Sequence, residues 1–178
     1  YRVYRVYRVY RVYRVYRVSL RGDVMKSLYY YEFPIGVIGI AQEGDFITDV
    51  FFKSIKNIDG EIVETDLIKE TAEEIKEYFE GVRKEFDIPI KLNGTEFQKS
   101  VWKKLIDTSY GEIVSYGDIA KDIQNPKAAR AVGMANNKNP IVIIVPCHRV
   151  VGKNGDLVGY AGGLDIKKNL INLEKANI

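Results

Sequence analysis

Residues 113–140, IVSYGDIAKDIQNPKAARAVGMANNKNP, decide the fold of the C-terminal half of this chain. Ser115 and Asp118 have the spacing of a capping box, so a short helix is expected to begin at the residue after this serine. Asn125 is expected to cap a second helix that has Pro126 as its first residue. Two short helices with a tight turn between them are typical of a helix-turn-helix, although other helical hairpins share the pattern.

The second predicted helix is rich in small residues and is expected to end near Asn136. Its small positions are Ala128, Ala129, Ala131, Gly133 and Ala135. A slim helix of this kind can approach a backbone or enter a narrow groove where long side chains would clash. Close packing against another helix is the alternative interpretation.

The segments around this hairpin complete the C-terminal half. A helix is expected after the capping box of Thr95 and Gln98, with Trp102 in the core. Residues 140–146, PIVIIVP, have the length and branching of a buried strand. A glycine-rich loop follows, and residues 164–175 are expected to form a last helix that turns Ile166, Leu170 and Leu173 inward and carries Glu174 near the same face.

The N-terminal half has the pattern of a small α+β unit. Residues 28–41 and 46–52 predict antiparallel strands, and residues 66–79 predict an amphipathic helix. We therefore expect an α+β protein, with a small N-terminal α/β domain containing an antiparallel sheet at residues 25–91. A mainly helical C-terminal domain with a winged-helix-like helix-turn-helix is expected at residues 92–178. Residues 25–91 show no catalytic pattern.

Residues 1–24 begin with YRV repeated six times, a period that matches neither a helix nor a strand. We interpret this segment as a disordered tag or translation artefact that ends before a native start at Met25. The alternative is a basic aromatic arm that binds nucleic acid.

The charge of the chain depends on this segment. The whole chain has 27 Lys and Arg against 24 Asp and Glu, but residues 1–24 contain seven of the arginines and one aspartate. The other 154 residues therefore have 20 basic and 23 acidic side chains. Residues 25–94 have a net charge of −7 and residues 95–178 of +4, which favours a C-terminal half that faces a polyanion. Ordinary surface charge is the alternative.

The chain has one cysteine and one histidine, and they are adjacent, at Cys147 and His148. A thiol attacks as a thiolate, and histidine is the usual base at neutral pH. Neighbouring residues of a strand point to opposite faces, so the pair can cooperate only through a turn in the backbone or a bridging water. Glu174 is the acidic residue that we expect to fix the histidine tautomer. The alternative is a buried cysteine that acts as a small apolar side chain.

The composition argues against a disulfide-stabilised protein, a conventional zinc protein and a membrane-spanning protein. One cysteine excludes an internal disulfide, and one Cys with one His makes a conventional zinc site unfavourable. No apolar run is long enough to span a membrane, and no signal peptide is visible, so we expect a cytoplasmic protein.

The sequence PCHRV at residues 146–150 resembles the active-site signature of the O6-alkylguanine-DNA alkyltransferases, also called methylated-DNA–protein-cysteine methyltransferases. GEIVSYGDIA, NPKAARAVG, NPIVIIVPCHRVVG, GYAGGLDIKKNLI and the LE of residues 173–174 resemble the same family in order and spacing. The resemblance is strong over residues 92–175, whereas residues 25–91 share only a general α+β character.

This resemblance implies a role for each matching residue. Cys147 would be the alkyl acceptor, His148 a base that acts through water, Glu174 its orienting group, and Asn139 a support for the active-site turn. Tyr116 would assist flipping of the nucleotide, and Arg130 would take the place that the base leaves in the stack. The DNA- and substrate-binding set is Tyr116, Ala129, Arg130, Gly133, Arg149, Val150, Tyr160, Ala161 and Gly162.

The function implied is DNA repair by direct reversal of damage. One alkyl group would pass irreversibly from O6-alkylguanine, and as a further substrate from O4-alkylthymine, to Cys147. The implied partner is double-stranded DNA bound by a monomer, with no cofactor and no metal. Some relatives hold a zinc ion in the N-terminal domain, but this chain has no Cys or His there. Ala161 replaces a larger or hydroxylated residue of some relatives, which leaves tolerance of bulky alkyl groups open.

Three other functions remain as alternatives to alkyl transfer. An alkyltransferase-like protein that senses lesions without chemistry would lack the reactive cysteine. A helix-turn-helix regulator would normally carry long polar side chains on its second helix. A cysteine hydrolase would need a direct contact between nucleophile and base.

Overall fold

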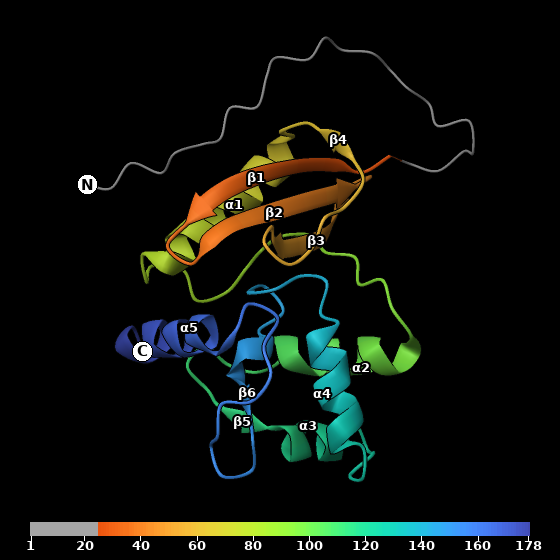
Figure 1. Ribbon diagram of the computed structural model, residues 1–178, viewed down its shortest axis with the longest axis vertical. Coiled ribbons are helices and arrows are strands. Elements are labelled where there is room, and N and C mark those ends of the chain that lie inside the picture. Colours follow the sequence, from red (N-terminus) through yellow and green to blue (C-terminus); the bar gives the residue numbers. More distant parts are fainter. Residues whose placement is uncertain (1–24) are drawn as a thin grey trace.

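The computed structural model describes residues 25–178, and the predictions made for residues 1–24 lie outside this range. The N-terminal unit contains a four-stranded sheet with the order β3-β2-β1-β4 (Figure 1). Its strands are β1 (Ser27–Phe33), β2 (Gly36–Glu43), β3 (Phe46–Phe52) and the short β4 (Glu61–Ile62). The first three strands pair antiparallel, as predicted, and β4 pairs parallel with β1.

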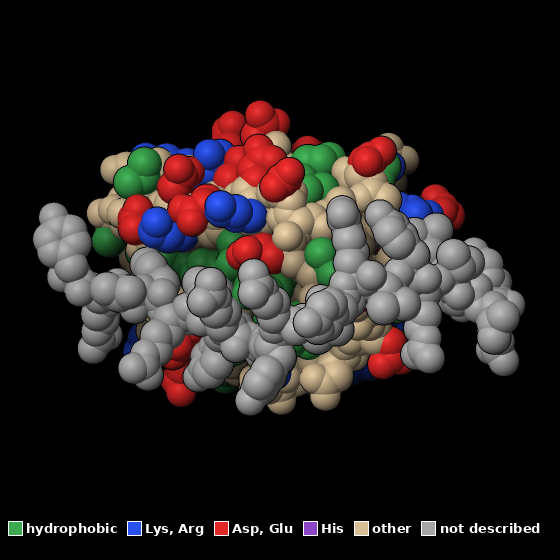
Figure 2. Space-filling model, turned by 90° about the horizontal axis from the view of Figure 1, so that it is seen from above, with side chains coloured by type: hydrophobic (Ala, Val, Ile, Leu, Met, Phe, Trp, Pro, Cys, Tyr) green, Lys and Arg blue, Asp and Glu red, His purple; other side chains and the backbone are tan. Residues whose placement is uncertain are grey.

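Helix α1 (Asp66–Phe79) matches the predicted range and packs against the first three strands. The Thr65 side chain accepts a hydrogen bond from the backbone N–H of Ile68 and so caps the helix. Tyr78, near the C-terminal end of α1, is fully buried. Figure 2 looks onto the N-terminal unit and shows many acidic side chains on the part of that face that is visible, in line with its negative net charge.

The C-terminal unit is mainly helical, as predicted. Its elements are α2 (Glu96–Ile106), β5 (Val114–Ser115), α3 (Tyr116–Asp122), α4 (Ala129–Asn137), the 3-10 turn η1 (Cys147–Arg149), β6 (Val150–Val151) and α5 (Leu164–Ala176). Both predicted capping boxes form, at the starts of α2 and α3. Trp102 is buried, and its Nε1 donates to the carbonyl O of Ala135 at 2.9 Å, which ties α2 to α4.

The predicted start of the second helix of the hairpin is wrong. Helix α4 begins at Ala129, and no side chain caps its first turn. Asn125 uses its backbone instead: its carbonyl O accepts a hydrogen bond from the N–H of Ala128, which closes a tight turn around Pro126. The proline therefore belongs to the connection between α3 and α4, and α4 is shorter than the sequence pattern indicated.

The strand predicted at residues 140–146 is also wrong, although the segment is largely buried. It forms a single bridge with Val50 of β3, and then turns back on itself through a bridge between Val142 and Val145. Ile143 has a φ of 73°, a left-handed conformation that a β-branched residue rarely adopts. The apolar character predicted the burial of this segment correctly, but not its backbone path.

The two units share one hydrophobic core. Ile47, Val50 and Phe52 of β3 belong to the same buried cluster as Trp102 of α2 and Ile141. In Figure 1, β3 is the strand that faces the C-terminal unit. The N–H of Val50 donates to the carbonyl O of Pro140, and its carbonyl O accepts from the N–H of Val142, both at 2.9 Å. The edge of the N-terminal sheet is thus bonded to the segment that leads to Cys147.

Candidate active site

Cys147 lies in the turn η1, directly after Pro146, and is almost completely buried. Its backbone N–H donates to the carbonyl O of Val145 at 2.8 Å, so the chain turns at the cysteine rather than continuing as a strand. Burial raises the pKa of the Cys147 thiol to about 11, against a smaller opposing effect of a hydrogen bond from Asn139. The side chain is therefore a thiol at neutral pH, and it needs a base before it can attack.

Asn139 holds the turn that carries the cysteine. Its Nδ2 atom donates to the Cys147 Sγ at 3.1 Å and to the carbonyl O of Val145 at 2.8 Å. Its Oδ1 atom accepts from the backbone N–H of Ile141 at 3.0 Å. One buried amide thus replaces the hydrogen bonds that a neighbouring strand would supply, and it places a donor on the sulfur.

Glu174 is the centre of a buried hydrogen-bond cluster. Its Oε1 atom accepts from the His148 Nε2 at 2.6 Å, the Tyr78 hydroxyl at 2.8 Å and the Arg149 Nη2 at 3.0 Å. Its Oε2 atom accepts from the Arg149 Nε and the Gly111 N–H, both at 2.9 Å. Burial alone would raise the pKa of Glu174, but the hydrogen bonds from His148 and Arg149 outweigh it and lower the pKa to about 2. The carboxylate is therefore charged and accepts hydrogen bonds only.

This carboxylate determines the state of His148. Because Glu174 can only accept, the His148 Nε2 must carry a proton, and the Nδ1 of the neutral ring has a free lone pair. Nδ1 is buried and has no hydrogen-bond partner within residues 25–178. Burial lowers the pKa of His148, which keeps the ring neutral and able to accept a proton. No hydrogen bond joins this ring to the Cys147 thiol in the part of the chain that the structure describes.

A second group of predicted residues surrounds an open hollow of about 350 Å³ beside α4. Its lining consists of Tyr116, Ala129, Arg130, Gly133, Asn137, Val158 and Gly159. The Tyr116 hydroxyl donates to the carbonyl O of Val158 at 2.9 Å. A Cβ atom on Gly133 would stand 3.7 Å from the Tyr116 ring, so a larger side chain there would fill the hollow. Ala129 and Gly133 of α4 thus face a space that another molecule could enter.

The predicted pocket loop rests on the N-terminal sheet. The ring of Tyr160 meets the ring of Phe52 edge to face, with centroids 6.1 Å apart. A Cβ atom on Gly162 would stand 2.8 Å from the same phenylalanine, so the loop needs glycine at this position. Burial, and then the nearby Cys147, raise the pKa of both Tyr160 and Tyr116. The hydroxyls of both tyrosines therefore stay protonated near the thiol. Ala161, between Tyr160 and Gly162, is partly exposed.

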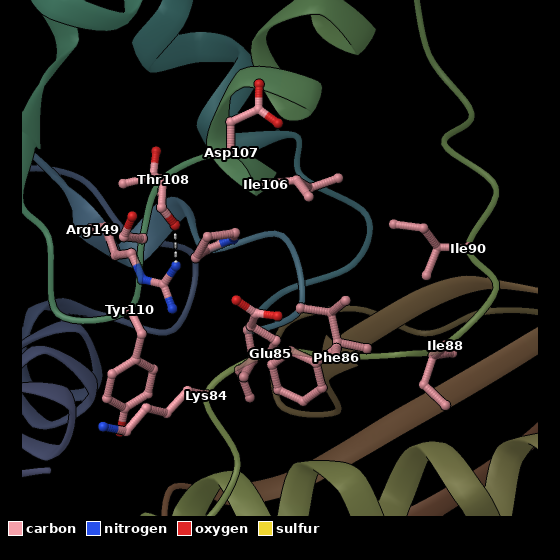
Figure 3. Close-up of a pocket in the computed structure, with 14 residues that line it drawn as sticks. Lys84, Glu85, Phe86, Ile88, Ile90, Ile106, Asp107, Thr108, Tyr110 and Arg149 are labelled. Carbon is pink, nitrogen blue, oxygen red and sulfur yellow. Dashed lines mark hydrogen bonds between the residues drawn. The ribbon is translucent and has the colours of Figure 1, made fainter. Parts of the chain in front are cut away.

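The placement of Arg149 corrects one prediction. We expected Arg149 to contact substrate or DNA, but its side chain is buried, and its guanidinium binds the Glu174 carboxylate and the carbonyl O of Thr108. It borders a cavity of about 480 Å³ at the junction of the two units, where Figure 3 shows it directed toward Thr108 and close to Tyr110. Arg149 is thus committed to an internal ion pair. Its neighbour Val150 is also buried, in the pairing of β6 with β5.

Two residues near the candidate reaction centre were not predicted from the sequence. Tyr78, from α1 of the N-terminal unit, donates to Glu174. Lys167 of α5 is fully buried, and its Nζ donates to the carbonyl O of Val158 at 2.8 Å. Burial lowers the pKa of Lys167, while Cys147 acts in the opposite direction. Helix periodicity could have found Lys167, because it lies seven residues before Glu174 on the same face, whereas no local signal marks Tyr78.

No group of three or more His, Cys, Asp or Glu side chains within residues 25–178 is arranged to hold a metal ion. In the same range, no helix has the length and apolar character that crossing a membrane requires.

The fold and the site together define a class of protein: a sheet-based N-terminal unit joined to a helix-turn-helix unit that carries a buried PCHRV cysteine. Two family models match this chain. The 6-O-methylguanine DNA methyltransferase ribonuclease-like domain matches residues 27–92, and the DNA binding domain of the same family matches residues 96–176. The chain belongs to the 6-O-methylguanine DNA methyltransferase family, which confirms the resemblance that its motifs indicated.

Similar proteins with curated names support this assignment. A methylated-DNA–protein-cysteine methyltransferase of Methanosarcina acetivorans is 50% identical over 153 residues, covering 83% of this chain and 98% of that protein. The inducible methylated-DNA–protein-cysteine methyltransferase of Bacillus subtilis is 44% identical over 142 residues, covering 79% of each chain.

Solved structures agree on the fold. The crystal structure of Mycobacterium tuberculosis OGT in complex with DNA has a TM-score of 0.81 and 41% sequence identity, covering 85% of this chain and 94% of that one. An O6-methylguanine DNA methyltransferase from Methanococcus jannaschii has a TM-score of 0.62 and 37% identity, covering 80% of this chain and 90% of that one. These structures confirm the predicted fold class, a small N-terminal domain with an antiparallel sheet followed by a helical C-terminal domain.

Proposed function

We propose that this protein repairs DNA by transferring the alkyl group of O6-alkylguanine to the sulfur of its own Cys147. The observation that carries the proposal is the buried thiol, which accepts a hydrogen bond from Asn139 and is followed by a histidine paired with a buried carboxylate. The curated names of the similar proteins state a methyl transfer between DNA and a protein cysteine, and one similar structure contains DNA.

The chemistry follows from the protonation states. The His148 Nδ1 accepts the Cys147 proton through a bridging water, and the Glu174 carboxylate stabilises the charged ring that forms. The thiolate sulfur attacks the alkyl carbon, a new S–C bond forms, and the C–O6 bond breaks with its electron pair moving onto guanine. Guanine takes up one proton in return, and the charged His148 ring releases the Cys147 proton through the bridging water, so the proton count balances. The Tyr116 hydroxyl exchanges its hydrogen bond to the Val158 carbonyl O for one to the leaving guanine and stays protonated. The products are a thioether and restored guanine.

The hollow beside α4 supplies a route for the base. An alkyl group on O6 lies inside the duplex, so the nucleotide must be turned out of the helix before a buried thiol can reach it. The slim face of Ala129 and Gly133 suits close approach to the minor groove. Arg130 is exposed at the rim of the hollow, where its guanidinium can occupy the space that the base leaves.

The reaction is proposed to occur once per protein molecule. A thioether cannot be released by thiol exchange, and the chain has no second cysteine. All groups that the chemistry uses come from one chain, so we propose a monomer that needs no cofactor. We also propose that it acts on DNA in the cytoplasm. O4-alkylthymine is proposed as a further substrate, because it presents an alkylated oxygen in a similar position.

The substitution Arg130→Ala tests the proposed flipping of the nucleotide. With alanine at this position, we expect transfer from duplex O6-methylguanine to slow by roughly 100-fold, because the vacated stack is left unfilled. Transfer from free O6-benzylguanine, which needs no flipping, should change little. Single-turnover rates with both substrates provide the measurement.

Lys127→Ala is the matched control, because it removes one positive charge from the same segment but does not line the hollow. Equal rate losses for Arg130→Ala on the duplex and on the free base would refute the flipping role.

A further inference from the structure

The N-terminal unit contacts three parts of the candidate active site. Val50 of β3 is hydrogen-bonded through both its N–H and its carbonyl O to the segment that leads to Cys147. Phe52, at the end of the same strand, supports the pocket loop through Tyr160 and Gly162. Tyr78 of α1 reaches the carboxylate that binds His148. The first two contacts position backbone, whereas the third adds a hydrogen-bond donor to the group that controls the base.

The hydroxyl of Tyr78 shares one oxygen atom with the base. Both the Tyr78 hydroxyl and the His148 Nε2 donate to Oε1 of Glu174, at 2.8 and 2.6 Å, and the two donor atoms are 3.4 Å apart. Nε2 carries a proton that points to Oε1 at 2.6 Å, so its 3.4 Å contact with the Tyr78 hydroxyl oxygen, which can accept as well as donate, is only a long and weak secondary hydrogen bond. Each donor therefore reduces the negative charge that Oε1 offers to the other.

We propose that Tyr78 is a positioning residue through which the N-terminal unit sets how strongly Glu174 holds the protonated form of His148. The hydroxyl fixes the orientation of the carboxylate and takes part of its charge, so that His148 returns its proton readily. The role in repair rests on the proposed function of His148 as the base, whereas the shared oxygen is a feature of the fold itself.

The other charged groups around His148 come from two elements. Glu174 and Lys167 belong to α5, and Arg149 belongs to the same turn as the histidine. Arg149 and Lys167 disfavour the charged ring, and Glu174 favours it. Loss of the Tyr78 hydroxyl leaves all three in place and removes only a competing donor on Glu174. Its expected effect is therefore a rise in the pKa of His148.

Tyr78→Phe tests this role without a change of shape. His148 is the only histidine of the chain, so nitrogen-15 NMR of labelled histidine reports its tautomer and its titration directly. We expect the titration midpoint to move to higher pH by about 0.5 to 1 unit, the scale of one typical net hydrogen bond. The acid limb of the single-turnover rate on duplex O6-methylguanine should move in the same direction.

Two comparisons make the test specific. Tyr31→Phe removes an equivalent hydrogen bond, from Tyr31 to Glu64 at 2.8 Å on the surface, and should leave the His148 titration unchanged. 3-Fluorotyrosine placed at position 78 is a stronger donor and should move the midpoint to lower pH. If Tyr78→Phe fails to fold, the titration midpoint of His148 in the fluorotyrosine protein still tests the role of the hydroxyl.

Identical His148 titrations in the wild type and in either folded variant at position 78 would overturn the proposal. The NMR measurement needs no DNA, so it separates this proposal from the proposed function. A shifted titration in a protein that transfers no alkyl group would support the role of Tyr78 and refute repair.

Discussion

Asn139 shows how one side chain can fix an active-site backbone. Its amide makes three hydrogen bonds, to the Cys147 sulfur and to two backbone groups of the segment before it. Buried hydrogen-bonding groups are costly when they lose their partners, so the amide determines both the path of the chain and the position of the thiol. The motif could suggest a supporting role for this residue, but only the fold shows that the amide touches sulfur.

Asn139→Ala should lower the free energy of unfolding by about 1–3 kcal/mol, because it leaves the Ile141 N–H without a partner and removes one of the two donors to the Val145 carbonyl O, which keeps the Cys147 N–H. Transfer to Cys147 should slow as well, since the sulfur loses its donor. Urea denaturation and single-turnover rates give the two values. Asn154→Ala, at an exposed loop position, is the control, and a loss of the same size in both variants would contradict this assignment.

At the scale of elements, capping boxes were the most reliable sequence signal. Thr95 with Gln98 and Ser115 with Asp118 predicted the starts of α2 and α3 correctly, because these side chains satisfy backbone groups in their own turn. The start predicted at Asn125 and Pro126 was wrong, because the same residue types also form tight turns.

The strand predicted at residues 140–146 was wrong for a different reason. Its apolar, β-branched residues do match the interior of the protein, but their backbone path is set by two kinds of partner: Val50 of β3, which is distant in sequence, and the Asn139 side chain directly before the segment. The contact of Tyr78 with Glu174 could not be predicted because it too is long-range and joins residues 96 positions apart. Composition predicts burial, whereas contacts of this range appear only in the folded chain.

The slim face of helix α4 is predicted to contact DNA, and added bulk on this face tests that contact. Gly133→Leu should weaken binding to duplex DNA by roughly tenfold, equivalent to about 1.4 kcal/mol, because the new side chain fills the hollow beside Tyr116. Fluorescence anisotropy with a labelled duplex measures the change. Ala176→Leu places the same leucine side chain at an exposed position of α5 and should bind like the wild type. An unchanged dissociation constant for folded Gly133→Leu would exclude α4 as the DNA-facing helix.

At the scale of the whole molecule, Glu174 joins segments that are far apart in the chain. It binds α1 through Tyr78, the loop before β5 through Gly111, and the turn η1 through His148 and Arg149. The same carboxylate thus joins the two units and holds the His148 ring, which we propose as the base. On this proposal, stability and activity are coupled at Glu174.

This coupling predicts a pH dependence of stability. The pKa of Glu174 falls from 4.5 to about 2 on folding, so its contribution is fully present above pH 4.5 and is lost as the pH falls toward 2. The shift corresponds to roughly 3 kcal/mol at neutral pH. The difference in unfolding free energy between wild type and Glu174→Gln should therefore shrink across this range in urea denaturation. A difference that stays constant would contradict the ionised state, and Glu61→Gln, an exposed carboxylate, serves as the control.

The central claim is that Cys147 itself receives the alkyl group. Intact-protein mass spectrometry after incubation with a duplex that contains O6-methylguanine, followed by peptide mapping, tests it most directly. The account predicts a gain of one methylene unit, located on Cys147, with one guanine restored per protein molecule. More than one guanine restored per molecule, or an unmodified Cys147 in a folded protein with a free thiol, would contradict it.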